Sequence, residues 1–195
     1  MKKIVLSLSL FAFLACGSQK MATETEAQTT SETVEKPETK PQKSPLMAEG
    51  NITLTDFKSG SNKAWFERGY NAYSPDQELV NAFGKAMKNH DYQIDVYMGT
   101  WCGDSRREVP RLYKLLEMID FDMDKLSVVA VNRAKQVPNV SPEIANQLNI
   151  HHVPTIIFYE NGKETERFVE SATESLVKDL TKIASDQTYT DSYGK

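Results

Sequence analysis

The chain has 195 residues and a formal net charge of −4, with 39% hydrophobic and 26% charged residues. This length suits one domain with additional segments. The negative charge argues against nucleic acid or an anionic membrane surface as the main partner. The composition therefore fits a soluble domain that carries a polar appendage.

The first 15 residues have the pattern of an export signal. Lys2 and Lys3 precede an apolar run over residues 4–14, which is too short to span a bilayer. The Phe-Leu-Ala-Cys sequence that ends at Cys16 resembles a bacterial lipoprotein cleavage box, and an ordinary secretory signal cut near Cys16 is the alternative. We expect a signal peptide over residues 1–15 and a lipid anchor at Cys16, in the cell envelope of a bacterium and facing the periplasm. Loss of the two lysines would take the net charge from −4 to −6.

A polar segment follows the leader. Residues 17–47 are mostly Thr, Ser, Glu, Gln, Lys and Pro, so they cannot bury a core and should be disordered. A coil of about 30 residues has a typical span of roughly 30 Å. We expect residues 16–47 to be a tether that lifts a domain over residues 48–187 off the membrane.

The first part of this domain is rich in aromatic residues. Residues 52–57 alternate and predict a short edge strand. Four aromatic residues then cluster around Gly69 without a clean helical or strand period: Trp65, Phe66, Tyr70 and Tyr73. They either cap one edge of the core, which we favour, or form an aromatic wall beside a functional turn. Ser74, Pro75 and Gln77 next predict the capping box of a helix.

The domain is organised around residues 92–107. An apolar run over residues 92–98 predicts a buried strand, and Val109, Leu112, Leu116 and Ile119 predict one stripe of a helix. Cys102 lies where the strand gives way to the helix. There the unpaired N–H groups and the helix dipole stabilise a thiolate over a thiol, so this placement favours a reactive sulfur.

The remaining elements complete an α/β pattern. The apolar run 126–131 predicts a covered strand, Ser141 caps a short helix, and the Asn161-Gly162 pair predicts a hairpin turn. Thr173 is expected to cap the last helix, and residues 188–195 to form a loose tail. The order β-α-β-α-β-α-β-β-α predicts a mixed central sheet flanked by helices on both faces.

The Trp101-Cys102-Gly103 sequence resembles the active-site turn of the thioredoxin superfamily. Pro110 lies where that family has a helix-kinking proline, Val153-Pro154-Thr155 resembles its cis-proline loop, and residues 156–169 resemble its closing hairpin. The resemblance covers roughly residues 91–185 and implies a thioredoxin-like fold. It implies Cys102 and Ser105 as catalytic residues, and a substrate-binding surface made of Trp101, Gly103, Asp104, Val153, Pro154 and Thr155. We expect no cofactor, and no metal either, because Cys102 and one histidine would supply only two ligands.

Two departures from the family pattern limit what carries over. Ser105 stands where the family has its second cysteine, and Val96 stands where it buries an acid. The neighbouring Asp95 would point to the opposite face of the strand. The two-cysteine chemistry of the family therefore does not transfer directly.

One thiol remains for chemistry if Cys16 is acylated. Cys102 could then form mixed disulfides that only an outside thiol resolves, with Ser105 as a hydrogen-bond donor to the sulfur. We expect a monothiol thiol–disulfide oxidoreductase that serves cell redox homeostasis. Its partners would be extracytoplasmic proteins or small thiols carrying disulfides, and no nucleic acid.

Other functions remain possible on the same residues. The first is a non-catalytic module that holds a peptide or partner in the same groove. A weaker one is a one-cysteine peroxide-reducing enzyme, with Arg106 or Arg107 beside the sulfur. His151 or His152 could act as a base towards Cys102, although surface residues of a loop are the favoured interpretation.

Overall fold

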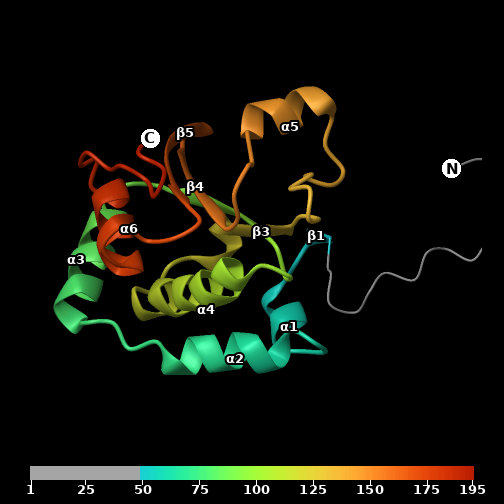
Figure 1. Cartoon of the computed structure of the whole chain (residues 1–195). Helices are drawn as coiled ribbons and strands as arrows, with labels where there is room; N and C mark the ends of the chain where they lie inside the picture. Colours follow the sequence, from blue (N-terminus) through green and yellow to red (C-terminus); the bar gives the residue numbers. More distant parts are fainter. Residues whose placement is uncertain (1–48) are drawn as a thin grey trace, which may run out of the picture. The chain divides into compact units, whose positions relative to one another are not determined.

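The computed structural model describes residues 49–195, which form a five-stranded mixed sheet with helices on both of its faces (Figure 1). The strands are β1 Gly50–Asn51, β2 Gln93–Met98, β3 Leu126–Ala130, β4 Thr155–Glu160 and β5 Lys163–Val169, in the spatial order β1-β3-β2-β4-β5. Strands β2 and β3 are parallel, whereas the other neighbouring pairs are antiparallel. The predicted mixed sheet is confirmed. The predicted signal peptide (1–15), tether (16–47) and anchor Cys16 lie outside the described residues.

Six α-helices accompany these strands in the described part of the chain: α1 Leu54–Phe57, α2 Lys63–Ala72, α3 Gln77–Met87, α4 Gly103–Met118, α5 Pro142–Leu148 and α6 Leu176–Ala184. A short 3-10 helix, Met123–Lys125, leads into β3. Within residues 49–195, no helix combines the length and the hydrophobicity needed to cross a membrane.

The larger core fills the face of the sheet covered by α2, α3, α4 and α6. Alternate residues of the strands supply it, for example Val96 and Met98 of β2 and Phe158 of β4, all fully buried. Helix α4 adds Leu112 and Leu116, which lie one turn apart on its inner stripe. Burial of these side chains holds the central strands and α4 in place. We call this cluster the main core.

The opposite face of the sheet carries a smaller apolar cluster, which we call the small cluster. Its buried members are Tyr97, Val131, Ile150, Val153 and Ile157. Because successive strand residues alternate between faces, Tyr97 points away from the main core to which Val96 belongs. Trp101 and Cys102 pack against the small cluster from the turn after β2. The turn singled out in the sequence is therefore seated on this second face.

The prediction of a strand over residues 52–57 is wrong. Only Gly50–Asn51 pairs with β3, at the edge of the sheet, and residues Leu54–Phe57 form helix α1. A capping box explains the difference, because Thr53 accepts from the Asp56 amide while the Asp56 carboxylate accepts from the Thr53 amide. This local pairing outweighs the alternating pattern.

Two helix starts also differ from the prediction. Helix α3 is capped by Asp76, whose carboxylate accepts from the amides of Glu78 and Leu79, and not by Ser74. Helix α6 is capped by Ser175 and not by Thr173, whose amide instead donates to the buried Asp179 carboxylate at 2.6 Å. In both cases the helix begins later than predicted, and its cap lies two residues further on.

The aromatic residues of α2 belong to the core, which confirms the favoured interpretation. Phe66 is buried and stacks on Phe57, with ring centroids 4.9 Å apart. Gly69 allows the close approach of α2 to α4, because a Cβ atom there would lie 3.1 Å from the Pro110 ring. Helix α2 thus supports α4 at its proline.

The C-terminal residues make defined contacts where the sequence suggests a loose tail. Tyr189 is buried, and the Ser192 hydroxyl donates to the Val169 carbonyl oxygen at 3.0 Å. The Tyr193 ring stacks on His152 with centroids 3.9 Å apart, and its hydroxyl donates to the Glu170 carboxylate. These contacts place the tail beside the loop that precedes β4.

Candidate active site

Cys102 is the N-cap of α4, with extended backbone angles of φ −87° and ψ 131°. Its amide donates to the Gly99 carbonyl oxygen at 2.9 Å, which closes the turn between β2 and α4. Its side chain is partly exposed, and its thiol is free. The partly exposed Cys102 therefore lies where the strand gives way to a long helix, as the sequence predicts.

The loop before β4 faces this sulfur. The Val153-Pro154 peptide bond is cis, as the resemblance implies, and both residues are buried. The Cys102 thiol donates to the Val153 carbonyl oxygen, with the two atoms 3.1 Å apart. Two segments some fifty residues apart in sequence, one carrying the thiol and one the proline, thus meet at one point.

Trp101 is held next to Cys102 by two contacts. Its indole Nε1 donates to the Val131 carbonyl oxygen at 3.1 Å, and the Arg133 guanidinium lies 5.2 Å from the centre of its ring. Gly99 leaves the space that the ring occupies, because a Cβ atom at Gly99 would lie 2.6 Å from the indole Cε2. The glycine before the turn is therefore required by the tryptophan within it.

Ser105 occupies the position of the family's second cysteine but is fully buried. Its hydroxyl accepts a hydrogen bond from the Gly99 amide at 3.1 Å. In the described part of the chain, no hydrogen bond joins this hydroxyl to the Cys102 sulfur. Ser105 thus ties the first turn of α4 to the end of β2.

Charged residues of the first turn of α4 are largely paired with one another. Asp104 accepts from Arg107 at 2.8 Å, and Arg107 also contacts the buried Glu108 carboxylate at 2.5 Å. Gly103 is exposed at the start of the helix. Arg106 differs from Arg107, because its Nε donates to the Thr100 carbonyl oxygen at 2.5 Å.

The structure places the other residues of the loop away from the sulfur. The Thr155 hydroxyl is buried and donates to the His152 carbonyl oxygen at 2.8 Å. His151 is exposed, and the partners of the His152 ring are Glu170, 3.7 Å away, and Tyr193. Neither imidazole makes a described contact with Cys102, which favours their interpretation as surface residues.

Strand β2 carries an acid, Asp95, on the face of the sheet opposite the main core. Val96 is buried in the main core, while Asp95 shares the opposite face of β2 with Tyr97, as the alternation predicts. Burial raises the pKa of Asp95 above its ordinary value of 3.8, and a hydrogen bond from Tyr97 opposes that rise. Burial together with the nearby Asp95 charge raises the pKa of Tyr97.

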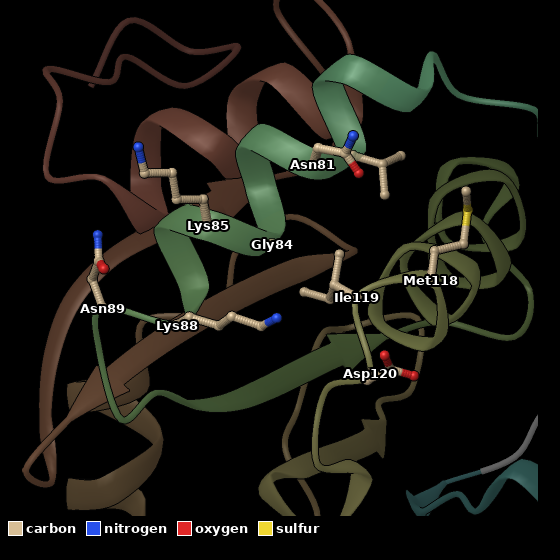
Figure 2. A pocket seen from close by; sticks show the side chains of 9 residues that line it. Asn81, Gly84, Lys85, Lys88, Asn89, Met118, Ile119 and Asp120 are labelled. Carbon is tan, nitrogen blue, oxygen red and sulfur yellow. The ribbon is translucent and has the colours of Figure 1, made fainter.

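A surface cavity of about 330 Å³ lies elsewhere, between α3 and the end of α4 (Figure 2). Lys85 of α3 and Lys88, which caps the end of that helix, line it from one side, and Met118, Ile119 and Asp120 from the other. None of the residues singled out in the sequence as functional lines this cavity. The candidate site around Cys102 is therefore separate from this cavity.

Sequence reasoning missed two contributors to the turn. Val131 and Arg133 follow β3 and reach Trp101 through a carbonyl oxygen and a guanidinium. They lie 30 or more residues from the turn in sequence, so no local pattern could reveal them. The parallel pairing of β2 with β3 explains the proximity, since it brings the carboxyl ends of both strands to one edge.

The fold and the site define an α/β protein with a thiol at the start of a helix, facing a cis-proline loop. The family profile described as "Thioredoxin" matches residues 77–182, which is more than half of the chain. The chain therefore belongs to the thioredoxin family, and its predicted thioredoxin-like fold is confirmed.

Individual relatives agree with this assignment. The chain is 31% identical over 93 residues to the chloroplastic thioredoxin Y1 of Arabidopsis thaliana, covering 47% of this chain and 49% of that protein. It is 36% identical over 93 residues to the chloroplastic thioredoxin Y of Oryza sativa subsp. japonica, covering 47% and 51%. The chain thus spans about half the length of these curated relatives.

One solved structure is similar over a longer stretch. It is the crystal structure of an HIV epitope-scaffold, with a TM-score of 0.51 and 11% sequence identity. The similarity covers 72% of this chain and 94% of that one. At this identity the likeness concerns the fold alone.

Proposed function

We propose that the protein is a thiol oxidoreductase that exchanges disulfides through the single sulfur of Cys102. The observation that carries this proposal is the position of that sulfur. It is partly exposed at the start of α4 and lies 3.1 Å from the Val153 carbonyl oxygen, beside the cis bond to Pro154. Family membership adds that proteins of this kind typically act on disulfides.

The reaction is a thiol–disulfide exchange. The Cys102 thiolate attacks one sulfur of a substrate disulfide, the substrate S–S bond breaks, and the other substrate sulfur leaves as a thiolate that takes up a proton. To ionise, the Cys102 thiol must give up the hydrogen bond that it donates to Val153. No electrons are gained or lost overall at this step, since one disulfide replaces another.

An external thiol completes the cycle. Ser105 has no sulfur with which to displace the bound substrate, and its hydroxyl is held by the Gly99 amide. A second thiol from outside must therefore attack the Cys102 mixed disulfide and release the sulfur again. This one-cysteine mechanism predicts long-lived adducts between Cys102 and its substrates.

We also propose that the protein works in the bacterial cell envelope, anchored by a lipid on Cys16 and facing the periplasm. The basic start, the short apolar run and the Phe-Leu-Ala-Cys sequence support this location. The polar residues 17–47 would let the domain reach substrates at a distance from the membrane. A Cys16→Ser variant should then leave the membrane fraction, while Ser18→Ala, two residues further on, should remain there.

Trapping of adducts tests the chemistry. Cells expressing the chain are acid-quenched, and proteins disulfide-linked to it are identified by mass spectrometry. We expect adducts in the unaltered chain, none with Cys102→Ser, and at least tenfold fewer with Ser105→Cys, because the new thiol can resolve them. Equal recovery from the unaltered chain and from Cys102→Ser would overturn the proposal.

A second candidate function is a partner-binding module without catalysis, favoured by the absence of a second thiol at Ser105. The two functions differ in a disulfide-reduction assay on insulin with excess dithiol. Activity that Cys102→Ser removes supports the oxidoreductase. Partner binding that persists unchanged in Cys102→Ser, without any reduction of insulin, supports the binding module.

A further inference from the structure

The chain has two tryptophans, and each has an arginine guanidinium near its ring. Arg133, from the segment after β3, lies 5.2 Å from the centre of the Trp101 ring. Arg106, on the first turn of α4, lies 5.8 Å from the centre of the Trp65 ring on α2. An aromatic face holds a guanidinium by cation–π attraction and leaves the hydrogen-bonding edge of the group open.

Both arginines contact the turn that carries the thiol. The Arg106 amide donates to the Cys102 carbonyl oxygen at 3.1 Å, and its Nε donates to the Thr100 carbonyl oxygen. Arg133 rests on Trp101, the residue just before Cys102. One cation therefore comes from α4 and the other from the segment between β3 and α5, and each contacts a residue next to or near Cys102 in the turn, Thr100 or Trp101.

Neither guanidinium is neutralised by a carboxylate within residues 49–195. Arg107 shows the contrast, since it pairs with both Asp104 and Glu108. The segment 131–142 also carries Lys135 and no acidic residue. Arg106 and Arg133 are thus two cations beside the turn without a described carboxylate partner, although the whole chain has a net charge of −4.

We propose that Cys102 acts on disulfides in acidic polypeptide segments, whose carboxylates bind Arg133 and Arg106 on either side of the attacked sulfur. A guanidinium binds a carboxylate with two parallel hydrogen bonds, which both attracts and orients it. The negative remainder of the protein repels acidic chains elsewhere on its surface, so the attraction is confined to the site. This inference rests on the proposed disulfide exchange and names its substrate class.

The geometry favours a polypeptide over a small anion. The two cations rest on different elements, Arg106 on Trp65 of α2 and Arg133 on Trp101 of the turn, so a ligand that pairs with both must reach from one element to the other. An extended segment with acidic residues on both sides of its cysteine meets this requirement. A small anionic disulfide such as oxidised glutathione has only a few bonds between its sulfur and its carboxylates, and it serves as the competing probe.

The test measures how fast mixed disulfides form on the purified full chain in detergent micelles. Three synthetic peptide disulfides are used that differ only in the residues flanking the cysteine, which are Glu, Gln or Lys. We expect the Glu peptide to react about tenfold faster than the Gln peptide at low salt, and the Lys peptide to react most slowly. High salt should reduce this preference by screening the exposed charges.

Variants locate the source of the preference. Arg133→Gln should lower the ratio of the Glu-peptide rate to the Gln-peptide rate about three- to tenfold, because it removes one of the two charges that bind the carboxylates. Lys163→Gln is the matched control, because it makes the same change in net charge at an exposed residue of β5. Lys163 pairs with Glu160, which lies at the end of β4 away from Pro154. Lys163→Gln should leave all three rates unchanged. Thermal unfolding of both variants checks that each remains folded.

The outcomes distinguish failure of the proposed acidic preference from failure of the proposed disulfide exchange. Equal rates for the three peptides would overturn the acidic preference while leaving disulfide exchange intact. A Lys163→Gln effect as large as that of Arg133→Gln would also overturn it, since net charge alone would then explain the rates. If Arg133→Gln slows oxidised glutathione as strongly as the Glu peptide, the commitment to polypeptides fails. No mixed disulfide with any probe would instead defeat the proposed function itself.

Discussion

The two faces of the central sheet differ in how they are covered. Four helices seal the main core over one face, whereas the small cluster on the other face has only five buried residues and the short helix α5 above it. No residue of α5 is buried, and Ile144 on it is 47% exposed. Because stability scales with buried apolar surface, most of it should come from the main core.

The functional turn belongs to the less covered face. Cys102, Trp101 and Val153 all pack in or against the small cluster. Ser105, only three residues after Cys102, is instead fully buried where α4 meets β2. The start of α4 thus joins the stable main core to the partly exposed Cys102, and substitutions on the two faces should therefore have different consequences.

Substitutions at two neighbouring residues of β4 that point to opposite faces should lower the unfolding free energy most. Phe158→Ala should cost about 4 kcal/mol of unfolding free energy and Ile157→Ala about 3 kcal/mol, since both side chains are fully buried. Only Ile157→Ala should also change the rate at which iodoacetamide alkylates Cys102 in the folded protein. Urea denaturation measures the first effect and mass spectrometry the second.

The exposed Ile144 provides the control for this pair. Ile144→Ala should change the unfolding free energy by less than about 0.5 kcal/mol. If Phe158→Ala altered the alkylation rate and Ile157→Ala did not, the division of roles between the two faces would be wrong.

The next effect concerns the glycine that makes room for Trp101. Gly99→Ala would place a Cβ atom 2.6 Å from the indole, so the ring must move, at a cost of about 1–3 kcal/mol. The tryptophan fluorescence of a Trp65→Phe background should shift with it, because Trp101 is then the only indole. Gly103→Ala is the control, since its Cβ would meet nothing within 4 Å. Equal spectra for the two variants would refute the proposed role of Gly99.

A similar cost is expected on the buried side of the same turn. Ser105→Ala leaves the Gly99 amide without its acceptor, which should cost about 1–3 kcal/mol. Ser127→Ala on β3 removes an exposed hydroxyl and should have almost no effect. Urea denaturation compares them, and hydrogen exchange at the Gly99 amide should accelerate only in Ser105→Ala. Two indistinguishable denaturation curves would show that the hydroxyl has no structural importance.

Much of this organisation was predictable from the sequence, because the signals are local. The apolar run before Gly99 and the periodic stripe of Leu112 and Leu116 indicate the strand and the helix that meet at Cys102. The Asn161-Gly162 pair indicates the hairpin turn, and Ser141 caps α5 as predicted. The alternation of β2 correctly separates Val96 from Asp95.

The features that the sequence did not reveal depend on competing local signals or on contacts between residues far apart in the sequence. At the start of the domain, the Thr53–Asp56 capping box competes with an alternating pattern and prevails. The sequence of α2 does not show a clear helical period, because Gly69 and the aromatic residues are placed to fit against α4. The contact of Arg133 with Trp101 depends on a strand pairing that no short pattern encodes.

The smallest effect follows from the acid on the less covered face. Burial raises the pKa of Asp95 above 3.8, so the folded protein binds this proton more tightly than the unfolded chain does. The ionised carboxylate therefore opposes folding at neutral pH, and its cost disappears as the pH falls below 3.8. Asp95→Asn should raise the urea midpoint slightly at neutral pH and leave it unchanged in acid.

Tyr97 stabilises the ionised form of Asp95, because its hydrogen bond to the carboxylate opposes the rise in the pKa of Asp95. Tyr97→Phe should destabilise the protein more at neutral pH when Asp95 is present than in the Asp95→Asn background, since only the charged acceptor loses a strong partner. A double-mutant cycle in urea measures the difference. If Tyr97→Phe lowered the unfolding free energy equally in both backgrounds, the charge of Asp95 would make no contribution through Tyr97. The side chain of Asp95 would then be solvated well enough to do without that hydrogen bond.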